Sequence, residues 1–322
     1  MEMGEAIATQ NIEKDMETCP FGEDVSGVSA IDNEDIADDD KDSVQEKQAN
    51  NGGVLGDNLN NGSNGKDKTW KGAPYPPTDA EKQAANDSKR KDGEKLQKVW
   101  RTVRVPGAGT IPTGNYPYTV AAHHLIPGNA SLYSEENLLQ NYMIKDKTVK
   151  AGGKKWQIKY HIGYNVNGAH NGVWLPGNYA IRSKASPTGV TWGKMQEEDW
   201  QLNYVAACSK VTKGQFHDTH EDYSDSVREL LNKIAVSLNQ HQCTCKICAD
   251  KNGGHIPPPY FIKMRLYKLS NYLRFNLTLG PSRWRRPWFA SGRWRNVVFK
   301  GNAVTPSTEF CSAFNQARRE EI

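Results

Sequence analysis

Two short histidine-rich segments contain the residues of this chain best suited to metal binding and proton transfer. His123 and His124 are adjacent, and His217 and His220 are separated by two residues. Hydrolysis of a phosphodiester near neutral pH needs a base that activates water and a cation that neutralises charge on the phosphate. Imidazole suits both tasks, because its pKa lies near neutrality and its neutral form binds metals. The four histidines therefore favour a metal-dependent nuclease.

The elements expected around these histidines limit how they can share one site. Residues 118–122 are rich in strand-forming residues, so we expect a short strand that ends at the adjacent histidines. Consecutive residues on a regular strand point to opposite faces, so both rings can serve one site only if the strand ends or twists there. Pro127 and Gly128 favour such an ending. The spacing of His217 and His220 would place both rings on one side of a first helical turn.

The rest of the central region predicts a mixture of strands and helices. We expect a helix from Ser134, and a strand, a loop and a second strand over residues 154–175. The clearest helix follows Asp222, because apolar residues recur there at three- and four-residue steps. Its apolar residues are Val227, Leu230, Leu231, Ile234 and Leu238. Trp174 and Leu175 are expected in the core rather than at a substrate.

The beginning of the chain differs from the rest in charge. The first 65 residues contain 16 acidic and 3 basic residues, a local charge of −13, with runs of Asn, Gly and Ser. Such a segment buries too little apolar surface to offset the entropy lost on ordering, so we predict a disordered acidic tail. The net charge of +4 therefore hides about +17 on the remaining residues, which would attract polyanions such as nucleic acid. The tail could balance this charge for solubility, or cover the basic face in the absence of substrate.

Three cysteines and a histidine after the long helix have the composition of a structural zinc site. Cys243, Cys245 and Cys248 are followed by His255. Four such ligands would close the coordination sphere, which excludes a catalytic role for this zinc. Reduced bystander cysteines or a disulfide are the alternatives, and Cys208 is a substitute fourth ligand.

A basic and aromatic segment follows the cysteines. Residues 256–300 contain ten basic residues and no acidic ones, interleaved with tryptophan and phenylalanine. Cations contact phosphates and indoles stack on exposed bases, so this segment could bind nucleic acid without sequence preference. The alternative is that the aromatic residues form a core and the arginines a solvated rim. The arginines expected to contact nucleic acid are Arg283, Arg285, Arg286, Arg293 and Arg295.

Three blocks between residues 115 and 240 agree in order and spacing with a known group of nucleases. The blocks are Ala122–Pro127, Asn171–Pro176 and His217–Tyr223. Together they resemble the AHH family of the HNH/endonuclease VII superfamily, which is common as C-terminal toxin domains of bacterial polymorphic toxins. The resemblance implies an α+β fold with a ββα-metal core of the HNH-like, treble-clef type, in which a β-hairpin packs on a helix and holds one divalent cation.

The resemblance also implies roles for individual residues. The implied ligands of the divalent cation, which would be Mg, Mn, Ni or Zn, are His123, His217 and His220. His124 would be the general base that activates water, and Asn171 would steady the backbone or the imidazole of that base. His161 and His170 receive no role.

One block departs from the family pattern. The family often has Gly or Pro near the second histidine of the third block, whereas this chain has Glu221 and Asp222. Asp218 and Glu221 are therefore candidate additional ligands.

These observations predict four regions and one activity. The regions are a disordered acidic tail at 1–70, a lead-in helix and loop at 71–114, a nuclease domain at 115–240, and a zinc-stabilised, basic and aromatic region at 241–322. The expected activity is metal-dependent endonucleolytic cleavage of DNA with little sequence preference. The alternatives are an RNase of the same fold and a non-catalytic, zinc-stabilised nucleic-acid-binding protein.

The resemblance further implies an antibacterial toxin or effector. Such a protein would need a cognate immunity protein in the producing cell and secretion or delivery machinery. No secretory signal and no membrane span is visible in the sequence. We therefore expect synthesis in a bacterial cytoplasm and delivery into the cytoplasm of a target cell.

Overall fold

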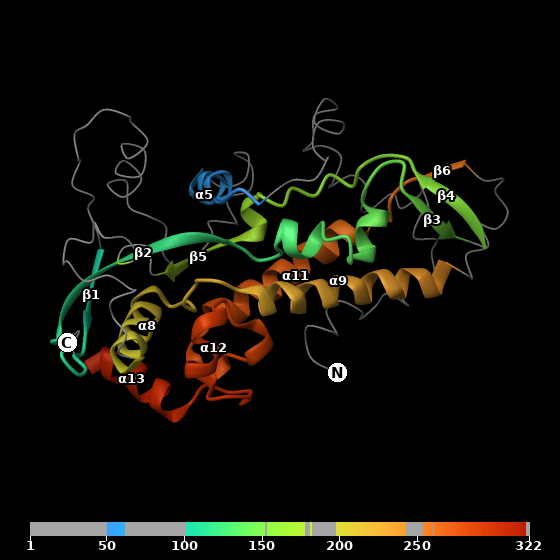
Figure 1. The fold of residues 1–322 in the computed structure, drawn as a ribbon. Helices are drawn as coiled ribbons and strands as arrows, with labels where there is room; N and C mark the ends of the chain where they lie inside the picture. The colour runs from blue at the N-terminus through green and yellow to red at the C-terminus, as the bar shows by residue number, and fades with distance from the viewer. Residues whose placement is uncertain are drawn as a thin grey trace. The chain divides into compact units, whose positions relative to one another are not determined.

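The computed structural model contains both helices and strands and has the expected α+β composition (Figure 1). It describes residues 50–61, 101–151, 153–177, 181, 198–242, 254–259 and 261–319. These residues fall into two compact units, each assembled from separate stretches of the chain. Unit 1 contains the described residues within 1–51, 124–171 and 224–273, and unit 2 those within 52–123, 172–223 and 274–322.

A three-stranded sheet with the order β1-β2-β5 belongs to unit 2, apart from the last residue of β2. Its strands are β1 (Arg101–Val105), β2 (Gly114–His124) and β5 (Gly172–Gly177). β1 and β2 are antiparallel, with Val103 opposite Tyr116. Strand β2 confirms the strand expected at residues 118–122 and ends at the adjacent histidines. Trp174 and Leu175 on β5 are buried, as expected.

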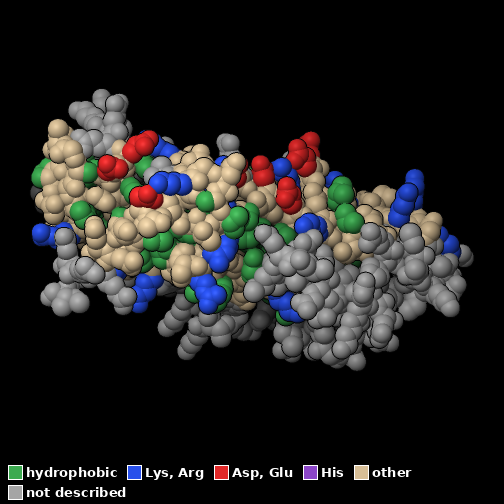
Figure 2. Space-filling model, turned by 90° about the horizontal axis from the view of Figure 1, so that it is seen from below, with side chains coloured by type: hydrophobic (Ala, Val, Ile, Leu, Met, Phe, Trp, Pro, Cys, Tyr) green, Lys and Arg blue, Asp and Glu red, His purple; other side chains and the backbone are tan. Residues whose placement is uncertain are grey.

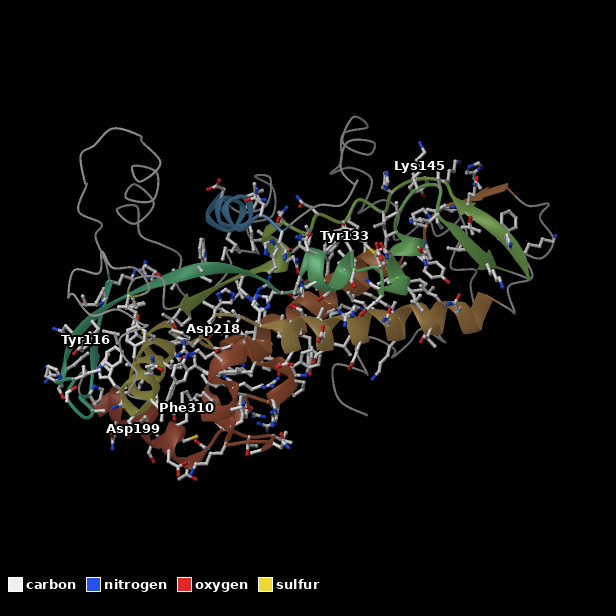
Figure 3. The ribbon with its side chains drawn as sticks, viewed as in Figure 1. Tyr116, Tyr133, Lys145, Asp199, Asp218 and Phe310 are labelled. Carbon is white, nitrogen blue, oxygen red and sulfur yellow. The ribbon has the colours of Figure 1, made fainter. Side chains whose placement is uncertain are left out.

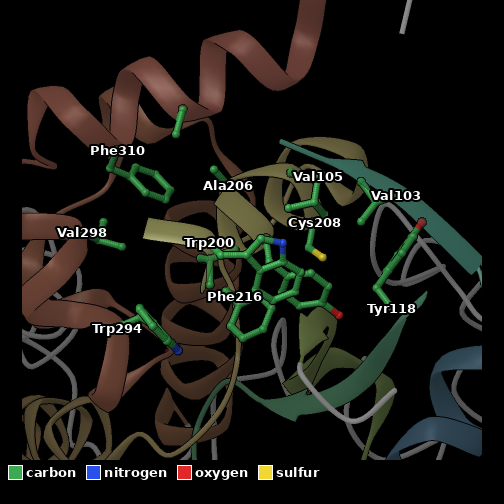
Figure 4. Packing of buried hydrophobic residues seen from close by; sticks show 14 of the residues in the cluster. Val103, Val105, Tyr118, Trp200, Ala206, Cys208, Phe216, Trp294, Val298 and Phe310 are labelled. Atoms are coloured by element: carbon green, nitrogen blue, oxygen red, sulfur yellow. The ribbon is translucent and has the colours of Figure 1, made fainter. Parts of the chain in front are cut away.

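Helix α8 forms the centre of unit 2. α8 (Glu198–Thr212) packs against α13 (Thr308–Arg319) and against strands β1 and β5. Trp200 and Tyr204, one turn apart on α8, stack with their ring centroids 5.4 Å apart. Trp200 also meets Tyr116 of β2 edge to face. The surrounding core draws on β1, β2, α8 and α13 (Figure 4).

The aromatic residues that lie among the arginines of the basic segment are buried, and Trp284, Phe289 and Trp294 belong to this core. Their exposed fractions are 4% or less, and they are Trp284, Trp288, Phe289 and Trp294. Trp284 lies against Phe310 of α13, and Trp294 belongs to α12 (Gly292–Phe299). The expectation that these rings stack on nucleic-acid bases is therefore wrong, because their apolar surfaces are already buried against other side chains. The alternative of an aromatic core is confirmed.

One part of the predicted acidic tail is folded. Residues Gly52–Asn61 form helix α5, which packs against β5 (Figure 1). Leu55 and Leu59, one turn apart, are buried, and the helix approaches Gly172 so closely that a Cβ there would lie 2.7 Å from Leu55 Cδ1. The prediction of disorder is wrong for this helix, because two leucines at helical spacing bury enough apolar surface to order it.

Unit 1 contains a second sheet and parts of two long helices. The sheet has the order β3-β4-β6, with β3 and β4 antiparallel and β6 parallel to β4. Its strands are β3 (Thr148–Ala151), β4 (Lys154–Ile158) and β6 (Gly254–Ile256). The helices are α9 (Glu221–Gln242) and α11 (Phe261–Thr278), of which residues 224–242 and 261–273 belong to this unit. The apolar stripe predicted for α9 is confirmed, because all five of its residues are buried.

Two predictions for the region between β2 and β5 need correction. The strands expected within residues 154–175 exist as β4 and β5, but they belong to different sheets. The helix expected from Ser134 is a short 3-10 helix, η3 (Leu138–Tyr142), preceded by a π-helical turn, η2 (Gly128–Leu132). Asn137 explains this difference, because its side chain donates to Leu132 O and accepts from Leu139 N, which holds the backbone in a turn. The other 3-10 turns are η4 (Ala169–Asn171), η5 (Pro281–Arg283) and η6 (Arg286–Trp288).

Other predictions lie outside the described residues. These include the tail up to residue 49, the lead-in helix toward Trp100 and the three clustered cysteines. Among the helices that the structure describes, none is both long and apolar enough to cross a membrane.

Replacement of Leu55 by alanine tests the docking of α5. We expect Leu55→Ala to lower the free energy of unfolding by about 3 kcal/mol, because a wholly buried side chain is removed from the contact with β5. The matched control is Val54→Ala on the same helix, where the side chain is 43% exposed, with an expected loss below about 0.5 kcal/mol. Urea denaturation measures both. Equal, small losses for the two variants would contradict the docking.

Candidate metal centre and catalytic histidines

Three of the four expected histidines meet in unit 2. One ligand nitrogen from each of His123, His217 and His220 lies within 4.8 Å of the others. The ring centroid of His123 lies 4.8 Å from that of His217 and 4.9 Å from that of His220. Imidazole nitrogens are ligands that suit Zn and Ni, and three protein ligands leave a coordination position for water or substrate. The donor set therefore fits a catalytic divalent cation.

The sheet and the start of α9 position these three rings. His123 is the penultimate residue of β2. His217 forms a parallel bridge with Gly177, the last residue of β5, and its backbone N donates to Pro176 O at 2.7 Å. His220 immediately precedes α9. The expectation that His217 and His220 share a helical turn is therefore wrong, because His217 is held by the strand.

Burial favours the neutral imidazole form of His220, the form that can bind a metal. His123 and His217 are buried, and His220 is partly buried. Burial lowers the pKa of His220, because desolvation penalises the charged imidazolium. A neutral imidazole keeps the lone pair that a cation requires.

Tyr223 is a neighbour of the cluster to which the sequence assigned no role. Its ring centroid lies 5.2 Å from that of His123 and 6.0 Å from that of His220. Burial raises the pKa of its phenol, which therefore stays protonated. The tyrosine ring packs beside the imidazoles of His123 and His220. The signal in the sequence that could have indicated this contact is its position three residues after His220.

Asp218 and Asp222 interact with residues at and before the start of α12 or on that helix. Asp218 lies near this helix (Figure 3), where Ser291 and the backbone of Gly292 and Arg293 hydrogen-bond its carboxylate. Burial is the larger effect and raises the pKa of Asp218. Asp222 pairs with Arg295. The N-cap residue of α12 is Ser291, and Asp218 interacts with this end of the helix. The expectation of an additional metal ligand is therefore not favoured for Asp218, and the side chain of Glu221 lies outside the described part.

The loop that carries His217 and His220 is hydrogen-bonded to the segment before α12. Thr219 O accepts from Gly292 N, and Gln215 Oε1 accepts from Ala290 N at 2.9 Å. A Cβ at Gly292 would lie 2.8 Å from Thr219 O, closer than van der Waals contact allows. The geometry of the ligand loop therefore depends on a glycine far from it in the sequence.

His124 belongs to unit 1, and its imidazole is nearly buried. Its Nε2 lies 2.8 Å from Oδ1 of Asn167, a residue to which the sequence assigned no role. The backbone N of Leu125, the next residue, donates to Asn171 O at 2.9 Å. The ring and the backbone that follows it are thus both held by the segment 167–171.

Asn171 fastens the chain just after His124. Its Oδ1 accepts from Ile126 N at 2.8 Å, and its Nδ2 donates to Ile126 O and Val166 O at 2.8 and 2.9 Å. Ser270 Oγ also donates to Asn171 Oδ1. The side chain of Asn171 is wholly buried and is hydrogen-bonded to the backbone of Ile126, two residues after His124. It is therefore in a position to steady that backbone, which is its expected role.

The two histidines that received no role lie in unit 1. His170 is buried with its ring centroid 5.0 Å from Tyr164 and 4.5 Å from Tyr267. His161 Nδ1 accepts from the backbone N of Lys145, which is labelled in Figure 3. Both rings contact other residues of unit 1, and neither belongs to the cluster of His123, His217 and His220.

The structural zinc site stays a prediction. Cys243, Cys245 and Cys248 lie outside the described residues. His255 lies on β6, half exposed, with Nε2 4.0 Å from a carboxylate oxygen of Asp146. Cys208 is buried in the core of unit 2, where desolvation raises the pKa of its thiol, so it does not suit the substitute role.

The five arginines expected at nucleic acid lie in unit 2, and several are engaged by the protein itself. Arg285 donates to Ser282 O and Trp284 O, and Arg286 donates to Gly301 O and Asn302 Oδ1. Arg295 pairs with an aspartate, whereas Arg283 and Arg293 are exposed. Basic and acidic side chains are interspersed on the face drawn in Figure 2. Contact of these arginines with nucleic acid stays a prediction.

A comparison with protein families identifies the segment that carries these histidines. Residues 108–251 match the model of AHH, described as a nuclease family of the HNH/ENDO VII superfamily with conserved AHH. This segment is similar to the AHH nuclease family. The match includes His123, His124, Asn171, His217 and His220, and it confirms the resemblance seen in the sequence. Neither the curated proteins nor the solved structures contain a match to the chain.

Removal of the Asn171 side chain tests the fastening of the AHH-family loop. We expect Asn171→Ala to lower the free energy of unfolding by about 3 kcal/mol, because the backbone groups of Ile126 and Val166 lose buried partners. Asn239→Ala is the control, since its Oδ1 accepts one partly buried hydrogen bond from Tyr142; its expected cost is about 1 kcal/mol. Urea denaturation compares them, and a smaller loss for Asn171→Ala than for the control would refute the interpretation.

A single methyl group at Gly292 tests the support of the ligand loop. In Gly292→Ala the new Cβ must displace Thr219 O, so we expect roughly tenfold weaker binding of Zn²⁺ or Ni²⁺ in calorimetric titration. Gly280→Ala is the matched control, because Gly280 precedes a helical turn and a Cβ there meets nothing within 4 Å. Unchanged affinity in Gly292→Ala would show that α12 does not hold the loop.

Proposed function

We propose that this protein is a metal-dependent endonuclease that hydrolyses phosphodiester bonds of DNA with little sequence preference. The observation that carries the proposal is the cluster of three imidazoles in an AHH-family segment, with His124 adjacent in sequence to one of them. Membership of a nuclease family supports nucleic acid as the substrate class.

The chain provides separate groups for the two parts of the reaction. His123, His217 and His220 would hold a divalent cation, and the imidazole donor set favours Zn or Ni over Mg. A cation bound there would neutralise charge on the phosphate and on the leaving oxygen. His124 would accept the proton of the attacking water. Its neighbour Leu125 and the peptide of Ile126 are fastened by Asn171, which would limit movement of the base.

The choice of DNA rests on less specific features. The residues after position 65 carry about +17, which favours a polyanionic substrate. Arg283 and Arg293 are exposed in unit 2 and could contact phosphates. The tryptophans of the segment are buried and offer no indole for stacking on bases, so backbone contacts would dominate and sequence preference would be small.

The biological setting belongs to the same proposal. We infer an antibacterial effector that is made in a bacterial cytoplasm, delivered into target cells and neutralised by an immunity protein in the producer. The resemblance of the three motif blocks to polymorphic toxin domains supports this setting. An acidic inhibitor would complement the basic residues of the chain.

Plasmid cleavage by the purified full chain tests the activity. We expect wild type to nick supercoiled DNA with added Ni²⁺, Zn²⁺, Mn²⁺ or Mg²⁺, and a chelator to stop the reaction. His124→Ala should lower the rate at least about 100-fold with unchanged metal binding, because it removes the base alone. His123→Ala should lower both metal affinity and rate. His161→Ala, outside the cluster, should keep the rate of wild type.

Three results would argue against the proposal. Cleavage that persists in chelator or in folded His124→Ala would exclude the assigned chemistry. Cleavage of a structured RNA with no cutting of DNA would change the substrate. Tight DNA binding without cutting in any of the four cations would identify a non-catalytic binding protein.

A further inference from the structure

The imidazole of His124 is held by an asparagine that lies outside the three motif blocks. Asn167 Oδ1 lies 2.8 Å from His124 Nε2, and the same oxygen accepts from the backbone N of Asn51 at 2.9 Å. All three residues belong to unit 1. One oxygen therefore serves as acceptor for two groups.

The hydrogen bond from Asn51 establishes which atoms carry protons. A backbone N–H is always a donor, so the side-chain atom of Asn167 that faces it is the oxygen and not the amide nitrogen. An amide oxygen has no proton to give, so His124 Nε2 must be the donor in the second bond. A neutral imidazole carries one proton, and His124 Nδ1 is therefore the nitrogen that keeps a lone pair.

The position of Asn167 is itself fixed by local structure. Its backbone N donates to Asn165 Oδ1 at 2.9 Å, and Gly168 N donates to Asn165 O at 3.0 Å, which closes a tight turn. The same turn leads to Asn171, which fastens Ile126. The segment 165–171 thus holds both the ring of His124 and the backbone that follows it.

We propose that Asn167 is a positioning residue that fixes the tautomer and orientation of His124, so that Nδ1 is the nitrogen that accepts a proton. This inference rests on the proposed nuclease function, in which His124 is the base. It also extends the functional unit beyond the family match, because Asn51 N and Asn50 Oδ1, which accepts from Gly128 N at 2.6 Å, come from the segment before α5.

Two replacements of Asn167 separate the hydrogen bond from the shape of the side chain. Asn167→Leu has a similar size and offers no acceptor, whereas Asn167→Asp keeps an oxygen at the same position. Asn232→Leu is the matched control, since Asn232 is also partly buried in unit 1 and makes two hydrogen bonds, with Leu138 N and Glu136 O. All variants are made in the full chain and checked for cooperative unfolding.

The first readout is steady-state cleavage of a DNA oligonucleotide at saturating cation. We expect Asn167→Leu to lower kcat about 10- to 100-fold, as is typical for loss of a group that orients a functional imidazole. KM and the dissociation constant of the cation should stay within about twofold, because the imidazole cluster keeps its geometry. Asn167→Asp should recover most of kcat, and Asn232→Leu should behave as wild type.

The second readout needs no activity. Nitrogen-15 NMR of labelled imidazoles at about pH 8.5, where histidine is neutral, distinguishes the two tautomers. We expect His124 to be protonated at Nε2 in wild type, Asn167→Asp and Asn232→Leu, and to populate both tautomers in Asn167→Leu.

The outcomes decide the two proposals separately. Wild-type kcat and a single tautomer in Asn167→Leu would overturn the positioning role, and so would equal loss of kcat in the Leu and Asp variants. If wild type cuts no nucleic acid in any cation, the nuclease function fails. A change of tautomer confined to Asn167→Leu would then still support control of the ring by Asn167, and its absence would overturn that too.

Discussion

The candidate site depends on the position of strand β5, which contacts both histidine segments. β5 pairs with β2, the strand that ends at the adjacent histidines, and its last residue, Gly177, forms the bridge to His217. This strand is buried along its whole length and is covered by α5 through Leu55. A misplaced β5 would separate His123 from His217, and the cluster would lose its three-ligand geometry. Burial of β5 is therefore needed for the geometry of the imidazole cluster as well as for stability.

The sequence predicted local features well and the connections between them poorly. The strand before the adjacent histidines and the amphipathic α9 were predictable, because each follows from a pattern within about twenty residues. The allocation of β4 and β5 to different sheets was not, since it depends on pairing between distant segments. Helix α5 was missed because its two leucines stand in an acidic, Asn-rich context that dominates an average over 65 residues. A shorter window would have shown the pair.

For the candidate site, the sequence identified the histidines but not the residues that contact them. The three histidines expected to bind a cation were identified from their motifs, and the structure brings them together. Two supporting residues were missed. Gly292 lies against the loop of His217 and His220, and Asn167 contacts His124. Neither lies in a motif block, and their importance comes from distances of a few ångströms that the sequence does not record. A buried polar group must find a partner, and that partner can come from any part of the chain. Segments outside a family match can therefore be as necessary as those within it.

The adjacency of His123 and His124 follows from the geometry of a strand. Consecutive side chains on a strand point to opposite faces, so two neighbouring histidines cannot easily bind the same cation. The structure agrees with this constraint, since His123 joins the imidazole cluster of unit 2 and His124 contacts Asn167 in unit 1. The two adjacent side chains thus have different surroundings. Under the proposed function the double histidine would serve two different functions at consecutive positions, so replacing either one should have its own kinetic signature.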